Sequence, residues 1–412
     1  TMGSSQLAVV LLSPPESGYS LLFKKDIAGI PLFKRLLLTL QKSGISEFLV
    51  LSRQLDEREF EIYRNEIESD PRFKSVLNWH DRTHFFETKE FEQTEAPISS
   101  KPFLLVNGNL VIHQKVVQQF MDSTNHRNPD GIFCLALESG KPGGLYLLPP
   151  KKINTLNYGA GTSVEEDRAE RVVLSADKNF WIEVRDPATA LTAEEHLLKS
   201  VGLSNDSLMD RFVTRFISRQ LTRLFLKTSL TPNQITFLSL LIGLGSAWYF
   251  FQGTYFSGIL GSLLLLVSAW VDCTDGEIAR LKFMATPWGA RFDIFCDNIV
   301  HFFVFFSIGM GVFSATGNPV FKLYGGLAVF GSLAAFMILG GIIVKNKQAV
   351  GQGEPLESNL IDQVANRDFV YFLLIMAWID KLDIFIFLTA IGANVFALYL
   401  MYQRSRWGKN SI

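Results

Sequence analysis

Two short stretches, DCTDGEIAR at residues 272–280 and GARFDIFCD at residues 289–297, place four aspartates between strongly apolar segments. Their carboxylates are therefore expected at or within a membrane, where an isolated charge costs several kcal/mol and usually marks a functional site. Four such groups close together are tolerable mainly when cations neutralise them. The two stretches therefore predict a metal site embedded in a membrane.

Apolar residues are concentrated in the second half of the 412-residue chain, of which 48% is hydrophobic. Residues 1–230 have the mixed composition of a soluble domain, whereas residues 232–402 consist largely of long apolar runs. The net charge of −1 says little about partners, and the absence of an aromatic-interleaved basic stripe argues against nucleic-acid binding. Three cysteines without metal-ligand spacing argue against a disulfide framework and fit a reducing compartment.

The N-terminal region predicts an α/β domain over residues 6–200. A buried strand at 7–12, a helical pattern at 31–42 and a second apolar run at 48–51 have the spacing of a βαβ unit. Further strands are expected at 103–106, 131–137, 144–148 and 181–184, and a helix at 192–201.

An amphipathic helix is predicted over residues 205–228, just before the first apolar run. Basic residues recur four apart, on one helical face, and apolar residues surround them: Arg211, Arg215, Arg219 and Arg223 with Phe212, Phe216 and Leu224. Such a helix is typical of a membrane surface. An ordinary solvated helix face is the alternative, and the nearby apolar run favours the membrane.

Six transmembrane helices are predicted, at 233–251, 255–275, 291–313, 322–345, 368–380 and 384–402. Most approach the ~20 residues that cross a bilayer, and the fifth is short. Basic residues are more frequent in the connections on one side, which the positive-inside rule assigns to the cytoplasm. We therefore expect an integral protein of the cell inner membrane with both termini cytoplasmic.

The aspartates form a plausible ligand set when the two stretches are placed on helices. Residues three and four apart share a helix face, so one face of the first helix carries Asp272, Asp275, Gly276 and Ala279. Asp293 and Asp297 stand four apart on the next helix. Carboxylates converging from two helices supply the hard oxygen ligands that suit Mg²⁺, Mn²⁺ or Ca²⁺.

The residues around the aspartates suit a phosphate ligand. Two ions would hold a pyrophosphate, and Arg280 would add a permanent cation. Gly276, Ala279 and Gly289 remove side-chain bulk, so that backbones approach or a flat ligand lies against them. The alternative is that the carboxylates are interfacial helix ends paired with neighbouring basic residues, namely Arg280, Lys282 and Arg291.

The complete pattern is Asp-x-x-Asp-Gly-x-x-Ala-Arg, eight residues, then Gly-x-x-x-Asp-x-x-x-Asp. It resembles the signature of the CDP-alcohol phosphotransferase family at all eight signature positions. The apolar runs and the amphipathic segment resemble that family too, so the resemblance covers residues 205–405. It implies an all-α membrane domain over residues 231–405, and a homodimer.

The resemblance also implies roles for single residues. Asp272, Asp275 and Asp293 would hold two divalent cations, Mg²⁺ or Mn²⁺, with Asp297 as a fourth ligand and as the general base. The metals and Arg280 would bind the pyrophosphate of a CDP-linked donor. The small residues would make room for the cytidine: Gly276, Ala279 and Gly289.

Three further residues are candidates for ligand binding. Asn233 belongs to a Pro-Asn pair before the first span that resembles an element near the nucleotide in many family members, and its alternative role is a helix start. Lys345 and Arg367 lie on the cytoplasmic side and are candidates for a phosphate or carboxylate on the acceptor. Arg367 is otherwise an interfacial anchor.

The N-terminal domain resembles sugar-phosphate nucleotidyltransferases, on the segments AGIPL at 28–32 and SGISEF at 43–48. Such a domain joined to a CDP-alcohol phosphotransferase resembles the fused inositol-phosphate cytidylyltransferase/di-inositol-phosphate phosphate synthases. The resemblance implies a cytidylyltransferase, unless the residues that carry that activity have been lost.

Several of those residues differ. The loop that would cradle a triphosphate is SPPESGY at 13–19, in which two prolines remove backbone N–H groups and Glu16 would repel phosphate. The expected Gly-Asp pair is Gly108-Asn109, and Arg185 stands where an acid is usual. We therefore expect an inactive domain that serves as a scaffold or forms a dimer.

The sequence thus favours a membrane transferase that moves a phosphoalcohol or phosphatidyl group from a CDP-linked donor to a hydroxyl and releases CMP. The acceptor is a polyol, a polyol phosphate or a lipid alcohol. One alternative is a bifunctional enzyme whose N-terminal domain makes the donor from CTP. An intramembrane cation transporter is another, although an ion path gains nothing from the fixed cation of Arg280.

Overall fold

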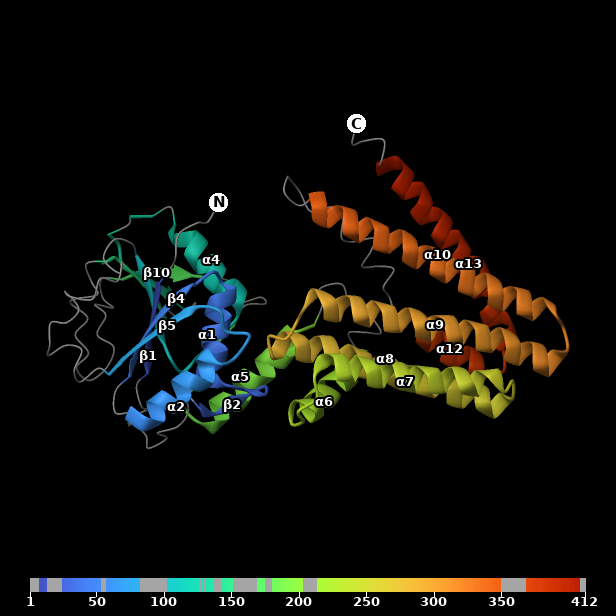
Figure 1. Ribbon diagram of the computed structural model, residues 1–412, viewed down its shortest axis with the longest axis horizontal. Helices are drawn as coiled ribbons and strands as arrows, with labels where there is room; N and C mark the ends of the chain where they lie inside the picture. Colours follow the sequence, from blue (N-terminus) through green and yellow to red (C-terminus); the bar gives the residue numbers. More distant parts are fainter. Residues whose placement is uncertain are drawn as a thin grey trace. The chain divides into compact units, whose positions relative to one another are not determined.

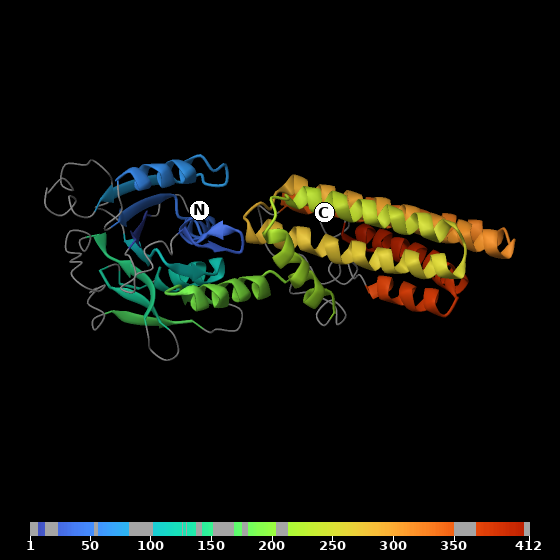
Figure 2. The same cartoon turned by 90° about the horizontal axis from the view of Figure 1, so that it is seen from below.

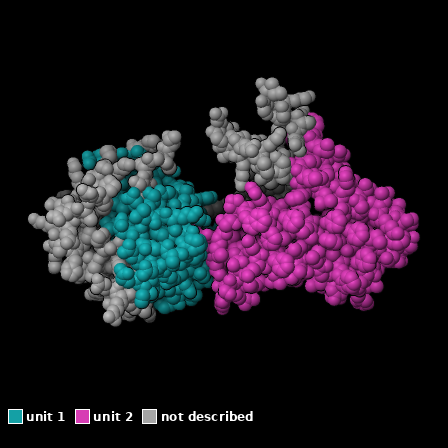
Figure 3. Space-filling model, in the orientation of Figure 1, with its two compact units in different colours: residues 1–200 teal, residues 201–412 magenta. Residues whose placement is uncertain are grey.

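The computed structural model describes residues 7–12, 24–52, 57–81, 102–125, 127–128, 130–136, 142–150, 169–174, 180–202, 213–349 and 368–407. The chain divides into two compact units, Thr1–Ser200 and Val201–Ile412 (Figure 3). The first is an α/β unit and the second is helical, in agreement with the predicted fold class.

A seven-stranded mixed sheet forms the centre of the first unit, in the order β10-β8-β9-β6-β1-β4-β5. The strands are β1 (Leu7–Leu12), β4 (Glu47–Ser52), β5 (Val76–Asp81), β6 (Phe103–Asn107), β8 (Phe133–Ala136), β9 (Pro142–Leu148) and β10 (Glu170–Val173). Strand β1 pairs in parallel with both β4 and β6, and five of its six residues are buried. A continuous apolar run of this kind suits a parallel strand that is covered on both faces.

The helices of this unit are α1 (Leu32–Lys42), α2 (Glu57–Glu68), α4 (Gln114–Thr124) and α5 (Pro187–Ser200) (Figure 1). Two short ribbons complete it, β2 (Asp26–Ile27) with β3 (Ile30–Pro31) and β7 (Leu110–Ile112) with β11 (Trp181–Glu183). The predicted helix at 192–201 begins earlier than expected, because Pro187 is its first residue and the Asp186 carboxylate accepts a hydrogen bond from Thr189 N.

The second unit consists of α6 (Arg215–Leu226), α7 (Pro232–Phe251), α8 (Tyr255–Leu281), α9 (Pro287–Thr316), α10 (Val320–Ala349), α12 (Asp368–Trp378) and α13 (Leu382–Trp407) (Figures 1 and 2). Threonine N-caps begin the three central helices, since the side chains of Thr231, Thr254 and Thr286 accept the orphan N–H groups of α7, α8 and α9. The predicted spans therefore start close to their expected positions.

Five of these helices are long and apolar enough to cross a membrane: α7, α8, α9, the described part of α10 and α13. The fifth predicted span, 368–380, corresponds to α12, which has 11 residues and is a shorter apolar helix. Because ~20 residues are needed to cross a bilayer, α12 does not by itself count as a span.

Helix α6 differs from the predicted basic surface helix at one position. Arg215 is only 7% exposed and forms an ion pair with Glu277 of α8. Phe216 and Leu224 are exposed, as are Arg223 and Lys227, so the polar and apolar residues expected at a surface lie on the remainder of the helix. Arg211 and Phe212 lie outside the described residues. The sequence periodicity groups the arginines but does not reveal the acid on a neighbouring helix.

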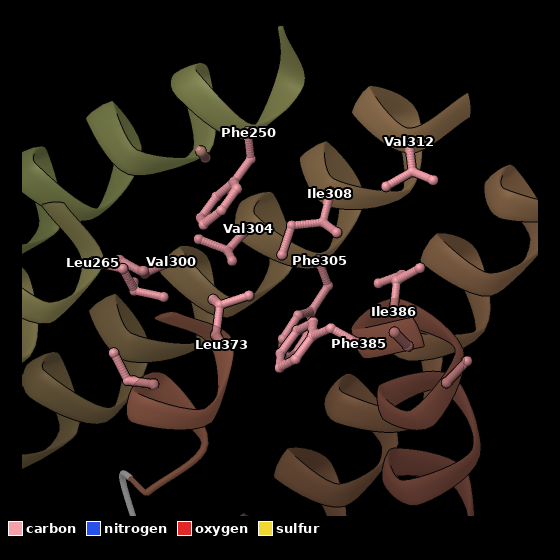
Figure 4. Packing of buried hydrophobic residues seen from close by; sticks show 14 of the residues in the cluster. Phe250, Leu265, Val300, Val304, Phe305, Ile308, Val312, Leu373, Phe385 and Ile386 are labelled. Carbon is pink, nitrogen blue, oxygen red and sulfur yellow. The ribbon is translucent and has the colours of Figure 1, made fainter. Parts of the chain in front are cut away.

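The core of the second unit includes buried residues of six helices: α7, α8, α9, α10, α12 and α13. Phe250 of α7, Val304 and Ile308 of α9, Leu373 of α12 and Phe385 of α13 are buried in one cluster (Figure 4). Helix α7 packs on both α8 and α9. Side chains from these helices thus fill a common interior, which fixes the helices that carry the aspartates.

Glycines allow the closest backbone contacts, but not at the positions the sequence indicated. A Cβ on Gly253 would lie 2.3 Å from the carbonyl oxygen of Gly311, and one on Gly309 would lie 2.8 Å from Cα of Gly325. These contacts join the end of α7 to α9, and α9 to α10. Small residues of this kind let membrane helices approach closely.

Candidate metal centre and nucleotide site

Three of the predicted ligands meet. One carboxylate oxygen from each of Asp272, Asp275 and Asp293 lies within 4.8 Å of the others. Helix α8 runs unbroken through the signature, which puts Asp272 and Asp275 about one turn apart, and α9 supplies Asp293. Metal–oxygen distances are about 2.0–2.6 Å, so a shared divalent ion fits between oxygens with this separation.

Burial strengthens this interpretation. Asp272 is 4% exposed and Asp275 is 6% exposed, while Asp293 is half-buried. Carboxylates so close together repel one another, and burial weakens the screening by water. The arrangement is the one expected of a cation site.

Asp297 does not belong to the group of three carboxylates. It lies one helical turn beyond Asp293 on the same face of α9 and is half-buried. The predicted roles of Asp297 as fourth ligand and general base remain predictions.

Hydroxyl groups on α7 contact two of the aspartates, a feature that the sequence analysis missed. Thr236 Oγ1 donates to Asp275 Oδ2, and Ser239 Oγ lies 3.3 Å from Asp272 Oδ1. Further along, Ser268 Oγ of α8 donates to the Ser239 carbonyl at 2.7 Å. As the residue number rises along α7, that of the partner on α8 falls, so the two helices are antiparallel with one fixed register.

The small signature residues accommodate side chains. A Cβ on Gly276 would meet Arg280 Nη1 at 3.2 Å, so the guanidinium lies over this glycine. A Cβ on Gly289 would meet Asn233 Oδ1 at 3.1 Å. Neither glycine marks a close approach of two helix backbones, which was one of the two expectations. Ala279 is half-buried on the same helix as Gly276.

Arg280 and Asn233 are both exposed, so a ligand could reach either side chain. Arg280 Nε donates to the carbonyl of Val201 at 3.1 Å, which orients the guanidinium. Asn233 is brought from the start of α7 to the start of α9, close to Gly289. The Pro-Asn pair therefore serves as a helix start and also brings Asn233 close to a signature residue.

The two acceptor candidates are not described at the level of side chains. Lys345 belongs to the last turns of α10, and only its backbone is described. Arg367 lies outside the described residues, immediately before α12. Both stay predictions.

In the N-terminal unit, the residues at the expected cation site bind one another. Asn109 Nδ2 donates to Glu183 Oε1 at 3.3 Å, and Arg185 Nη2 pairs with Glu183 Oε2 at 2.6 Å. Arg185, at the position where the resemblance implies an acid, is thus paired with Glu183. The presence of glycine at position 108 has a structural explanation, because a Cβ on Gly108 would lie 2.8 Å from the Leu11 carbonyl oxygen. The loop at 13–19 lies outside the described residues.

A buried arginine organises the AGIPL segment. Arg35 of α1 donates to the carbonyls of Ile27 and Ala28, where Ala28 and Gly29 both have positive φ. Desolvation by burial lowers the pKa of Arg35 to about 9, partly opposed by Glu194. The hydrogen bonds compensate the buried cation, so this segment has a structural role that is independent of any nucleotide.

Comparison with known proteins places the aspartates within a family. Residues 229–405 match the model of the CDP-alcohol phosphatidyltransferase family. The match covers less than half of the chain and includes the aspartates. It contains all eight signature positions, from Asp272 to Asp297.

Several curated proteins are similar to part of this chain. A bifunctional IPC transferase and DIPP synthase of Aquifex aeolicus is 35% identical over 126 residues, which are 30% of this chain and 28% of the relative. An archaetidylinositol phosphate synthase of Pyrococcus horikoshii is 26% identical over 155 residues, which are 36% of this chain and 79% of the relative. The chain spans between 28% and 40% of the length of the four bifunctional relatives.

Solved structures resemble the two parts of the chain more distantly. HddC from Yersinia pseudotuberculosis, complexed with GMP-PN, has a TM-score of 0.35 and 16% identity and covers 46% of this chain and 98% of its own. The phosphatidylinositol phosphate synthase PgsA1 of Mycobacterium tuberculosis, with CDP-DAG bound, has a TM-score of 0.34 and 20% identity and covers 46% of this chain and 92% of its own. Values of this size do not establish a shared function.

Proposed function

We propose that the chain is an integral membrane transferase that moves a phosphoalcohol or phosphatidyl group from a CDP-linked donor to a hydroxyl acceptor and releases CMP. The observation that carries this proposal is the meeting of Asp272, Asp275 and Asp293 inside the segment that matches the CDP-alcohol phosphatidyltransferase family. The proposed domains are an N-terminal domain at 6–200, an interfacial helix within 205–228 and a membrane domain at 231–405.

The aspartates and Arg280 would have different tasks, metal binding and phosphate binding. Asp272, Asp275, Asp293 and Asp297 would hold two divalent ions, Mg²⁺ or Mn²⁺, which would neutralise phosphate charge and stabilise the leaving CMP oxygen. Arg280 would bind a donor phosphate oxygen, since its guanidinium is exposed and oriented by the Val201 carbonyl.

The nucleotide and the acceptor need further groups. Gly276, Ala279, Gly289 and Asn233 would line the cytidine site. Asp297 would take the proton from the attacking hydroxyl, the task of a general base within hydrogen-bond range. The acceptor would be a polyol, a polyol phosphate or a lipid alcohol, with Lys345 and Arg367 binding its anionic group. The name of the archaetidylinositol phosphate relative favours a polyol phosphate.

The proposed setting is the cell inner membrane, with six spans and both termini cytoplasmic. Five long apolar helices support most of this topology, and α12 would be the remaining, shorter span. Helix α6 would lie at the interface through its exposed side chains: Phe216, Arg223, Leu224 and Lys227. A homodimer is proposed from the family resemblance alone.

The central test is CMP release by the purified full-length chain in detergent. The chain is incubated with candidate CDP-linked donors and alcohol acceptors, with Mg²⁺, with Mn²⁺ or with a chelator, and the product is identified by mass. We expect CMP release that depends on the metal and the acceptor, and that is lost in Asp275→Asn. Release of CMP unaffected by chelation or by Asp275→Asn would contradict the proposed site.

The N-terminal domain is proposed to be inactive as a nucleotidyltransferase, with a scaffolding role. The Arg185–Glu183 ion pair supports this, because it puts a fixed cation where nucleotidyl transfer needs a divalent one. The bifunctional relatives favour the opposite possibility, that this domain makes the donor. Full-length chain is therefore incubated with CTP, Mg²⁺ and polyol phosphates. We expect no pyrophosphate release above a heat-inactivated control; clear release would establish the bifunctional alternative.

A further inference from the structure

Glu277 lies within the signature but points away from the aspartates. It follows Asp275 by two positions on α8, which places it about 200° further around the helix. Its side chain is 1% exposed, and the family pattern leaves its position variable. A carboxylate buried this deeply needs partners, since an uncompensated charge in such a place is strongly unfavourable.

Among the described residues, the partners of Glu277 all come from one face of α6. Arg215 Nη1 and Ser218 Oγ each donate to Glu277 Oε1 at 2.8 Å, and Thr222 Oγ1 donates to Glu277 Oε2 at 2.7 Å. The three donors are spaced three and four residues apart, so they form one stripe along the helix. Arg215 is 7% exposed, and Ser218 and Thr222 are fully buried. We refer to these four residues as the Glu277 clamp.

The clamp specifies one register between the two helices. Moving α6 by one residue along its sequence would translate its side chains by about 1.5 Å and rotate them by about 100°. All three donors would then miss the carboxylate. A buried ion pair with every partner in place is a device for specificity more than for net stability.

The clamp acts on the same turns of α8 that carry the metal ligands. Asp275 receives the hydroxyl of Thr236 from α7, while Glu277, two residues later, is held by α6. These turns lie near the end of α8, at Leu281, where helices otherwise fray. Two helices thus hold the last turns of α8 from different sides.

We propose that Glu277 is a positioning residue for the metal centre, an inference that rests on the proposed function. Through Arg215, Ser218 and Thr222, it sets the rotation of the end of α8 so that Asp272 and Asp275 meet Asp293 of α9. Helix α6 is accordingly part of the machinery that assembles the site, in addition to any contact that its outer face makes with lipid.

The test measures Mn²⁺ binding directly, by electron paramagnetic resonance of the full-length chain in detergent. The first variant is Glu277→Ala, and a milder one is the double variant Ser218→Ala/Thr222→Val, which keeps the ion pair. We expect Glu277→Ala to weaken Mn²⁺ binding about 10-fold or more, the range found when outer partners of metal ligands are removed. The double variant should show a smaller change in the same direction.

The control separates positioning from plain loss of stability. Ile386→Ala removes a fully buried side chain from α13, within the core and outside the clamp. We expect it to lower the melting temperature without weakening Mn²⁺ binding. Should clamp variants that remain folded bind Mn²⁺ as the wild type does, the clamp would be a structural fastening only, and the proposal would be wrong.

A rescue experiment adds a second readout. Arg215→Met alone leaves the Glu277 carboxylate buried without its cation, whereas Arg215→Met with Glu277→Gln removes the charge and keeps an oxygen for the hydroxyl donors. We expect the double variant to recover Mn²⁺ affinity relative to Arg215→Met, and absence of recovery would contradict the proposal. If the wild-type chain bound no Mn²⁺, the proposed function itself would be refuted. If the wild type bound Mn²⁺ and the clamp variants bound it equally well, only the positioning role of Glu277 would be refuted.

Discussion

Thr236 and Ser239 show how hydroxyl groups prepare buried carboxylates for a ligand. Each hydroxyl has a single proton, and Ser239 Oγ lies closer to the Thr236 carbonyl, at 2.7 Å, than to Asp272, at 3.3 Å. Thr236 is therefore the stronger partner of the two. A hydrogen bond to one oxygen of a carboxylate fixes the plane of the group and the direction of its other oxygen.

Replacement of Thr236 tests this role. Thr236→Val keeps the shape of the side chain but removes the donor, so we expect Mn²⁺ binding to weaken by about 10-fold or more. Thr236→Ser should restore most of the affinity, and Ser239→Ala should have a smaller effect. Isothermal titration with Mn²⁺ measures the change. Ser262→Ala, a buried serine earlier on α8, is the control; equal weakening there would point to a general loss of packing.

Asp297 separates metal binding from proton transfer. Asp297→Asn keeps the size of the side chain and cannot accept the proton of the acceptor. We expect CMP release to fall by about 100-fold or more, the usual contribution of a general base, with Mn²⁺ binding weakened but not abolished because the three other aspartates remain. Turnover near the wild-type rate would show that the base is another group. Loss of Mn²⁺ binding instead would make Asp297 chiefly a metal ligand.

Among the elements, α7 depends on glycine at one position and not at another. Gly253, just after α7, has φ +68 and touches the Gly311 carbonyl, whereas Gly245 within α7 has open space around its Cα. We expect Gly253→Ala to destabilise the chain by about 2 kcal/mol or more, from clash and backbone strain. Gly245→Ala should be neutral or stabilising by up to about 1 kcal/mol. Thermal unfolding in detergent compares the two, and similar melting temperatures would contradict the close contact.

A buried carboxylate ties α1 to the turn that follows α2. Asp70 accepts two hydrogen bonds from the Arg72 guanidinium, at 2.8 and 2.6 Å, and pairs with Lys34 of α1. The Arg72 hydrogen bond, and then Lys34, hold the pKa of Asp70 well below its usual range. A lowered carboxylate pKa gives stability above the unfolded-state pKa of about 4, and that stability is lost as pH falls below it.

We therefore expect the first unit to lose stability progressively as the pH falls below about 4. Asp70→Asn should cost about 3 kcal/mol at pH 7, because it leaves buried cations without their acid, and should flatten the dependence on pH. Hydrogen exchange in α1, measured on the full-length chain at several pH values, follows this change. The same acid sensitivity in Asp70→Asn as in the wild type would place its origin in other groups.

Local patterns predicted the elements that are either continuously apolar or clearly capped. The strand at 7–12 and the helix at 31–42 match β1 and α1 within one residue. Helix α2, with the sequence EREFEIYRNEIE, was missed because it is mostly charged and shows only a narrow apolar stripe. Periodicity places residues on faces; it does not tell which helix lies opposite.

For the candidate site, spacing alone grouped Asp272 with Asp275 on one helix and Asp293 with Asp297 on the next, and the structure brings the first three together. Two sets of contacts could not be predicted: the one between Thr236 and Asp275, and those between Glu277 and α6. Each joins residues that are far apart in the sequence. Of the two alternatives for Gly276 and Gly289, the structure does not show a close approach of helix backbones, because the side chains of Arg280 and Asn233 lie beside them. The alternative of a flat ligand stays a prediction.

Within the whole molecule, a divalent ion should stabilise only the unit that holds the aspartates. An ion that binds the folded state raises the stability of that state by mass action. Among the described residues, none of the candidate ligands belongs to the sheet of the first unit. We expect saturating Mn²⁺ to slow hydrogen exchange in α7, α8 and α9 and to leave β1, β4 and β6 unchanged. Asp275→Asn should abolish the difference. Uniform slowing over both units would contradict a site confined to the second.

Helix α7 is anchored at both ends, and this limits how its length can vary in evolution. Near its start Thr236 meets Asp275, and just past its end Gly253 meets Gly311. Inserting or deleting one residue between them would swing one anchor about 100° around the axis. Homologues that retain both contacts should therefore differ in this stretch by substitution and not by gaps, whereas the connections between helices are free to lengthen.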